Sequence, residues 1–94
     1  MPLFTTRIEL HSVLQEDLKA LHMALSSENF SNTIRDEAGS VFILPAGEYN
    51  KEGEYTKEQV LDSAIRAAGK TGKDCSILVT ESSGRSWANL TKVK

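Results

Sequence analysis

Residues 4–10 read FTTRIEL, and this stretch sets the architecture. Every second side chain from Phe4 to Leu10 is one that a protein core can hold, whereas Arg7 and Glu9 share the opposite face. This period of two is typical of a strand with one buried face. Residues 76–81 (SILVTE) predict a second strand near the other end of the chain.

Two helices are predicted between these strands. Ser12 and Gln15 have the spacing of a capping box, and leucines then recur at helical spacing, so we expect a first helix over residues 13–27. Thr56 and Gln59 repeat the capping-box spacing before a second apolar stripe that ends at Ala68.

The middle of the chain predicts a hairpin. Residues 30–35 (FSNTIR) and 41–44 (VFIL) flank a short polar connection that contains a glycine. Residues 46–55 (AGEYNKEGEY) are polar and punctuated by glycine, and we expect them to form a long loop.

The resulting order βαββαβ defines an α+β fold of the ferredoxin-like type. We expect one domain over residues 1–94, with a four-stranded antiparallel sheet of order 4-1-3-2 and both helices on one of its faces. The predicted core consists of Phe4, Ile8, Leu10, Leu18, Leu21, Leu25, Val60, Ala64, Ile77 and Val79.

Composition excludes several classes of function. With a formal net charge of −2, the chain has no overall positive field, so any contact with nucleic acid has to be a local patch. Phosphate-binding glycine loops, zinc-spaced Cys and His sets and nucleophile elbows do not occur, and we expect neither a metal nor a cofactor.

Several features favour a cytoplasmic protein. The lone Cys75 cannot form an internal disulfide and is expected to act as a small buried hydrophobe. The first residues lack the pattern of a signal peptide, and no apolar run is long enough to cross a membrane.

Two histidines are the candidate acid/base groups. His11 is expected on the strand face that carries Arg7 and Glu9, so a base, a carboxylate and a phosphate-binding cation would lie within a few strand steps. A solvated sheet edge explains the same residues. His22 lies on the first helix, where an exposed histidine with no chemical role is the alternative.

Arg85 and Trp87 follow the turn at Ser83 and Gly84. A cation beside an aromatic ring can hold a phosphate and stack a base of single-stranded RNA. Folding of Trp87 back over the core is the alternative.

The stretches FTTRIELH, NFSNTI, LPAGEYN and LVTESSGRSWANL resemble the small bacterial GhoS-type proteins over nearly the whole chain. That family is named for a type V antitoxin, an endoribonuclease that cuts the messenger RNA of its toxin. It is similar in fold to small CRISPR-associated nucleases, which have an Asp where this chain has Glu9. The resemblance implies cleavage of messenger RNA, with His11, His22 and Glu9 as the catalytic candidates.

A non-enzymatic interaction module is the alternative function. It would use the open sheet face or an edge to bind RNA, another protein or a second copy in a homodimer. The two hypotheses differ in the surface that they require: a contiguous positive groove for a nuclease, and an apolar or mixed patch for an interaction module.

Overall fold

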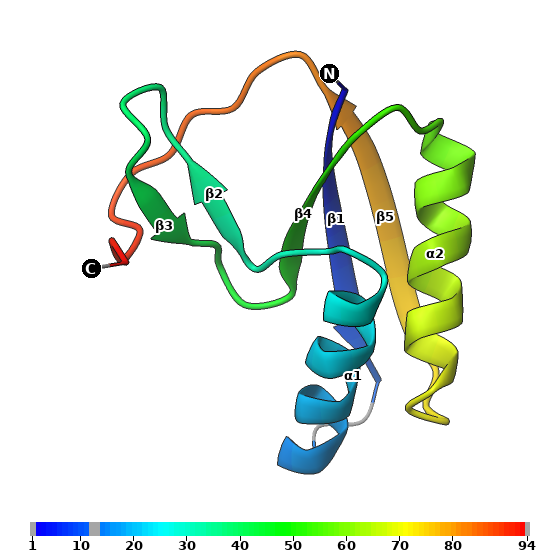
Figure 1. Cartoon of the computed structure of the whole chain (residues 1–94). Helices are drawn as coiled ribbons and strands as arrows, with labels where there is room; N and C mark the ends of the chain where they lie inside the picture. The colour runs from blue at the N-terminus through cyan, green and yellow to red at the C-terminus, as the bar shows by residue number, and fades with distance from the viewer. Residues whose placement is uncertain (1, 12–13, 94) are drawn as a thin grey trace.

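A computed structural model describes residues 2–11 and 14–93 of the chain. The elements follow the order β1 (Leu3–Leu10), α1 (Gln15–Ser27), β2 (Thr33–Arg35), β3 (Val41–Ile43), β4 (Glu48–Glu52), α2 (Lys57–Gly69) and β5 (Cys75–Ser82) (Figure 1). The α+β class is therefore confirmed, and both predicted helices form.

The main sheet is antiparallel and has three strands in the order β4-β1-β5. β1 lies in the centre, where Thr6 is paired with Tyr49 on one side and with Val79 on the other. β2 and β3 form a separate two-stranded sheet. The predicted four-stranded sheet of order 4-1-3-2 is thus not what the described residues form.

The largest correction concerns the predicted loop at residues 46–55, because this segment contains β4. Its residues EYNKE lack an apolar alternation, yet Tyr49, Asn50 and Lys51 are all buried. Tyr49 and Lys51 lie opposite Thr6 and Phe4 on the helix side of the sheet. Polar side chains fill positions that normally carry apolar ones, so the sequence pattern does not reveal the strand.

The predicted hairpin forms but stands away from the main sheet (Figure 1). It joins β4 through a single bridge, in which Ser31 and Asn50 exchange backbone hydrogen bonds of 2.8 and 2.7 Å. The far side of the hairpin is bonded to the chain end: Ile43 N–H donates to the carbonyl of Thr91 at 2.9 Å, and Val93 N–H donates to that of Val41 at 2.7 Å.

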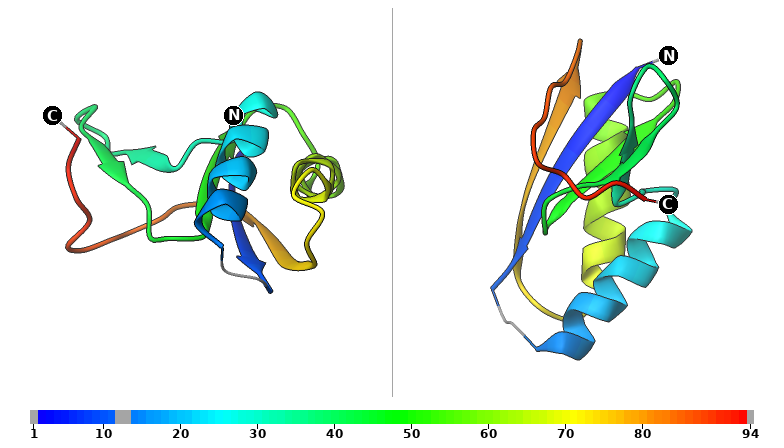
Figure 2. Two further views of the ribbon diagram at one scale, coloured as in Figure 1. Left: turned by 90° about the horizontal axis from the view of Figure 1, so that it is seen from below. Right: turned by 90° about the vertical axis from the view of Figure 1, so that its left-hand side faces the viewer.

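Both helices cover one face of the main sheet (Figure 2). α2 begins at the predicted capping box, in which Thr56 and Gln59 bond reciprocally. The capping box predicted for α1 includes Ser12, which lies outside the described residues; Leu14 precedes α1 and gives it no side-chain cap. The buried core between helices and sheet includes Phe4, Ile8, Leu21, Leu25, Val60 and Ala64.

Four other residues of the predicted core behave differently. Leu10, Ile77 and Val79 are partly buried and pack against the core, as does Cys75. Leu18 is 43% exposed, so its placement in the core was wrong. Figure 1 shows that the first part of α1 extends beyond the end of the sheet, so side chains there have less of the sheet to pack against.

Candidate functional site

A groove lies between the open face of the main sheet, the β2-β3 hairpin and residues 83–93, which we call the C-terminal segment. Three adjoining hollows of about 270, 360 and 340 Å³ make up this groove, and Arg85 and Ile34 line all of them. We call it the Arg85 groove. Its other walls include Thr5, Asn50 and Trp87.

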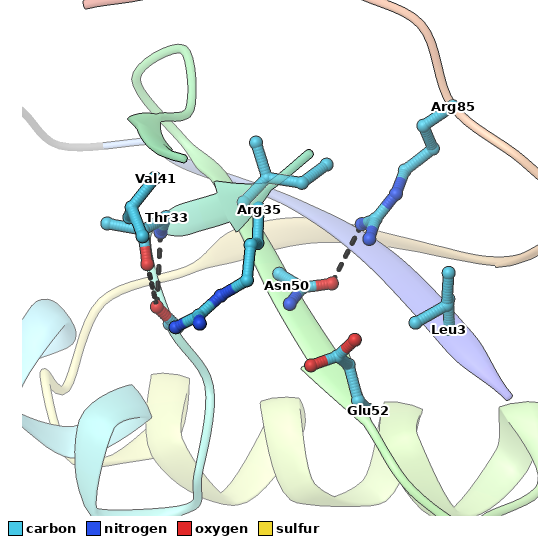
Figure 3. Close-up of a pocket in the computed structure, with 9 residues that line it drawn as sticks. Leu3, Thr33, Arg35, Val41, Asn50, Glu52 and Arg85 are labelled. Atoms are coloured by element: carbon cyan, nitrogen blue, oxygen red, sulfur yellow. Dashed lines mark hydrogen bonds between the residues drawn. The ribbon is translucent and has the colours of Figure 1, made fainter. Parts of the chain in front are cut away.

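Arg85 reaches from the C-terminal segment onto the open sheet face (Figure 3). Its Nη1 donates to Asn50 Oδ1 at 2.7 Å and to Thr5 Oγ1 at 3.3 Å. Thr5 and Asn50 are paired directly across β1 and β4. The sheet register therefore fixes both acceptors and holds the guanidinium in one place.

The guanidinium keeps donors for a ligand. Arginine has five N–H groups in a planar fork, and Arg85 uses only Nη1. Among the described residues, none accepts a hydrogen bond from its Nε or Nη2. Burial lowers the pKa of Arg85 and Glu52 opposes that shift, but an arginine remains charged at neutral pH.

Trp87 does not fold back over the main core, which was one of the two alternatives that the sequence left open. Its ring packs against Phe42 of β3, with ring centroids 5.6 Å apart and an angle of 59° between the rings. The same side chain lines two of the three hollows and is only partly buried. Trp87 thus covers the hairpin rather than the main core, and it also presents an aromatic surface to the groove.

The charge of the groove is mixed. Arg35 and Arg85 line it, but so do Glu48 and Glu52. Arg7 lies farther along the same face, with its Nη1 3.9 Å from Glu48 Oε2. A contiguous positive groove is therefore not what these residues form, and the apolar walls supplied by Ile34, Leu44 and Leu90 add to the mixed character.

The predicted cluster of Arg7, Glu9 and His11 lies on the open face, away from Arg85. Arg7 and Glu9 line a separate shallow hollow of about 170 Å³. His11 bonds through Nε2 to Ser76 Oγ at 2.9 Å. At about 3.3 Å per residue, His11 lies roughly 20 Å along the strand direction from Thr5, so it is remote from the Arg85 guanidinium.

His22 lies on the other side of the sheet. It is exposed on α1, and its ring centroid is 6.1 Å from that of Tyr49, a helix-side residue. The main sheet separates the two histidines, so the structure does not bring His11 and His22 together.

Sequence reasoning missed the residues that position Arg85. Thr5 gives no signal beyond its place on the polar strand face, and Asn50 and Glu52 fall in the segment expected to be a loop. The signal that could have found them is the alternation of side chains in β4. Because Tyr49 and Lys51 face the helices, Glu48, Asn50 and Glu52 face the groove.

Within residues 2–11 and 14–93, no group of three or more His, Cys, Asp or Glu side chains could hold a metal ion. Over the same part of the chain, every helix is too short or too polar to cross a membrane.

Comparisons of the chain with protein-family models, curated proteins and solved structures found no match. The resemblance to GhoS-type proteins therefore stays a prediction.

Proposed function

We propose that the Arg85 groove binds a short stretch of single-stranded RNA, with a phosphate on Arg85 and a base against Trp87. One observation carries this proposal: a positioned guanidinium that faces the groove with donors to spare. Arginine forks suit phosphate oxygens, and stacking on an aromatic ring accepts any base.

The mixed charge limits the kind of binding that we propose. A basic channel follows many phosphates, whereas Glu48 and Glu52 beside Arg85 would repel a long phosphate backbone. The groove suits one or two phosphates and an unpaired base. We therefore propose recognition of a loop or an end in a messenger RNA rather than of a duplex.

The resemblance to GhoS-type endoribonucleases implies that the protein cleaves this RNA. We propose that it does so and thereby acts as an antitoxin. In this chemistry a base takes the proton of the 2′-hydroxyl, the 2′-oxygen bonds to phosphorus, and the 5′-oxygen leaves and takes a proton from water. Of the carboxylates that line the groove with Arg85, Glu52 is our first choice for the base, because it is the one whose charge acts on Arg85, whereas Glu48 lies 3.9 Å from Arg7. His11 and Glu9 are the second choice, with Arg7 as their phosphate ligand.

A ferredoxin-like origin of the fold is part of the same proposal. The strands β4-β1-β5 correspond to the third, first and fourth strands of that fold, and the two helices correspond to its two helices. The bridge between Ser31 and Asn50 lies where the second strand of that fold would pair. The hairpin then leaves the sheet and forms a wall of the groove.

The proposal is tested by the affinity of a fluorescent single-stranded RNA for the wild type, Arg85→Ala and the control Arg66→Ala. Arg66 is an arginine on the helix side, where it pairs with Glu28 at 3.2 Å. Loss of a charged hydrogen bond costs about 1.5–3 kcal/mol, so Arg85→Ala is expected to weaken binding about tenfold or more. Equal affinity of all three proteins would refute the groove as the site.

Cleavage is assayed separately with Glu52→Gln, His11→Ala and His22→Ala, with EDTA and with Mg²⁺ in parallel. Removal of a general base typically costs about 10²- to 10⁴-fold in rate, so Glu52→Gln should cut slowly while it still binds RNA. Loss of cutting in His11→Ala alone would move the chemistry to the Arg7, Glu9 and His11 cluster.

A protein-interaction module is the second candidate, and the mixed and partly apolar lining of the groove favours it. Binding of no RNA by the wild type, under conditions in which it is folded, would support this candidate.

A further inference from the structure

The outer strand β5 offers a long free edge. All eight of its residues pair with β1, from the pair Leu3 and Ser82 to the pair Leu10 and Cys75. Within the described part of the chain, no strand pairs with its other side. Figure 1 shows this edge on the side of the sheet opposite the hairpin.

The hydrogen-bond pattern identifies which residues point their backbone groups outward. His11 N–H donates to the carbonyl of Asp74 at 2.9 Å, which makes this a hydrogen-bonded pair. Such pairs alternate along an antiparallel ladder, so the even-numbered residues of β5 bond to β1. The N–H and C=O groups of Cys75, Ile77, Val79 and Glu81 are consequently directed away from β1.

This edge lacks the devices that normally prevent pairing. β5 reads CSILVTES and contains no lysine, no proline and only one charge, Glu81. Leu78 is 64% exposed on the open face. On the helix side, a hollow of about 260 Å³ between α2 and β5 is lined by Ile65, Cys75 and Ile77 among others, and Ile65 is 52% exposed.

We infer that β5 pairs antiparallel with β5 of a second copy of this chain, about a two-fold axis at Leu78. The two three-stranded sheets then form one continuous sheet. In this register Ile77 meets Val79 of the other copy in a hydrogen-bonded pair, and Leu78 lies beside its own copy in a non-hydrogen-bonded pair, where side chains approach most closely.

A second copy fits this edge better than an unrelated strand because the edge is self-complementary. A two-fold axis at one residue matches the outward-directed residues of both strands and keeps equivalent faces together. Glu81 then lies opposite Cys75, and the two residues before Cys75, Lys73 and Asp74, carry opposite charges, so no like charges are paired directly across the two strands. The Arg85 groove lies over β1 and β4 and stays open in the dimer.

Charge substitutions at the two-fold axis test the inference. The molar mass of each variant is measured by size-exclusion chromatography with light scattering. The wild type is expected at twice the chain mass of 10.3 kDa. Leu78→Lys and Leu78→Glu each place like charges beside each other and should run as monomers, and their equimolar mixture should restore the dimer. Ile43→Lys, at a 40% exposed position on β3, is the control that should stay dimeric.

A wild type that is monomeric at its highest soluble concentration would overturn the inference. So would a dimer that persists in Leu78→Lys. Circular dichroism of the variants shows whether they are folded, and a cysteine pair gives a test that does not depend on a disruptive substitution.

That second test uses Leu78→Cys in a Cys75→Ser background. Non-hydrogen-bonded pairs have Cα atoms about 4.5 Å apart, which is within the range for a disulfide. Mild oxidation should therefore link two chains. Thr80→Cys in the same background lies opposite Ser76 of the other copy and should remain unlinked. Equal linking of both variants, or none in either, would contradict the register.

Discussion

Lys51 and Arg85 are two partly or fully buried cations on opposite faces of the same sheet. Lys51 lies under the helices and is 3% exposed. Arg85 lies over the open face, where it binds Asn50, the residue that precedes Lys51 in β4. Adjacent strand positions therefore support two cations in very different surroundings.

The ammonium of Lys51 is enclosed by the protein. It donates to the carbonyl of Glu28, at the end of α1, and lies 4.9 and 4.7 Å from the ring centroids of Phe30 and Tyr55. Burial lowers the pKa of Lys51, the Glu28 carboxylate opposes that shift, and Arg66 adds to it. These contacts tie α1 to β4.

Arg85 has a different role because its surroundings are incomplete. Two side-chain acceptors fix its Nη1, and its remaining donors face a groove. A cation that is enclosed by protein groups stabilises the fold, whereas a positioned cation with unused hydrogen-bond donors can bind an anion. We therefore regard the helix side of the sheet as the structural face and propose the open side as the functional one.

The largest expected effect is a difference in stability between variants of the two cations. Lys51→Ala removes a buried stem, a hydrogen bond and two ring contacts, so it should lower the free energy of unfolding by about 2–4 kcal/mol. Arg85→Ala should lower it by less, because Thr5 and Asn50 line the open groove and water can replace the two hydrogen bonds that they lose. Urea denaturation measures both, and equal losses would contradict the contrast.

The next effect concerns RNA affinity. Asn50→Asp keeps the shape of the side chain but places a carboxylate against Arg85, which neutralises the proposed phosphate site. We expect binding to weaken about tenfold, comparable to the loss of one charged hydrogen bond, while the protein stays folded. Fluorescence anisotropy measures the change, and unaltered affinity would show that Arg85 does not contact phosphate.

A smaller effect is the pH dependence that Lys51 gives to stability. Because its pKa is lower in the folded state than the ordinary 10.5, the unfolded chain binds more protons just below that pH. The contribution of Lys51 to stability should therefore rise as pH increases through the folded pKa toward 10.5. Burial raises the pKa of Tyr49, which lowers stability above pH 10.

The difference in unfolding free energy between the wild type and Lys51→Met isolates the lysine, since Tyr49 is present in both. A difference that does not change with pH would show that the ammonium is not disfavoured by burial.

The smallest expected effect is in salt dependence. Removal of one phosphate-binding cation makes the slope of log affinity against log salt shallower by about one unit, and we expect this change for Arg85→Ala. Arg7 is paired with Glu48, and Arg7→Ala should change the slope less. The reverse order would favour the Arg7, Glu9 and His11 cluster.

How far the sequence predicts the fold depends on how its apolar residues are spaced. β1, β5 and both helices follow from alternation, helical stripes and one intact capping box. β4 does not, because the stem of Lys51 occupies a core position and its ammonium contacts Glu28 and Phe30, which are distant in sequence, as well as the nearby Tyr55. The apolar run VFIL looks like a strand of the main sheet, but its strand β3 pairs with β2 and with the chain end instead.

The site is predictable in the same partial way. Arg85 and Trp87 stand out because a cation and an aromatic ring follow one turn, and both line the groove. Asn50 does not stand out, because its role depends on a strand whose sequence resembles a loop. His11 is a candidate because of its predicted strand face with Arg7 and Glu9, and His22 because of its residue type, but the sheet lies between the two histidines.

The most direct measurement of the central claim is an NMR titration of the labelled wild-type protein with single-stranded RNA. We predict that amide shifts move at Thr5, Ile34, Asn50 and Trp87, while Val60 and Ala64 under the helices do not respond. Shifts confined to the helix side, or to Arg7, Glu9 and His11 without Asn50 and Trp87, would contradict the assignment of the Arg85 groove as the binding site.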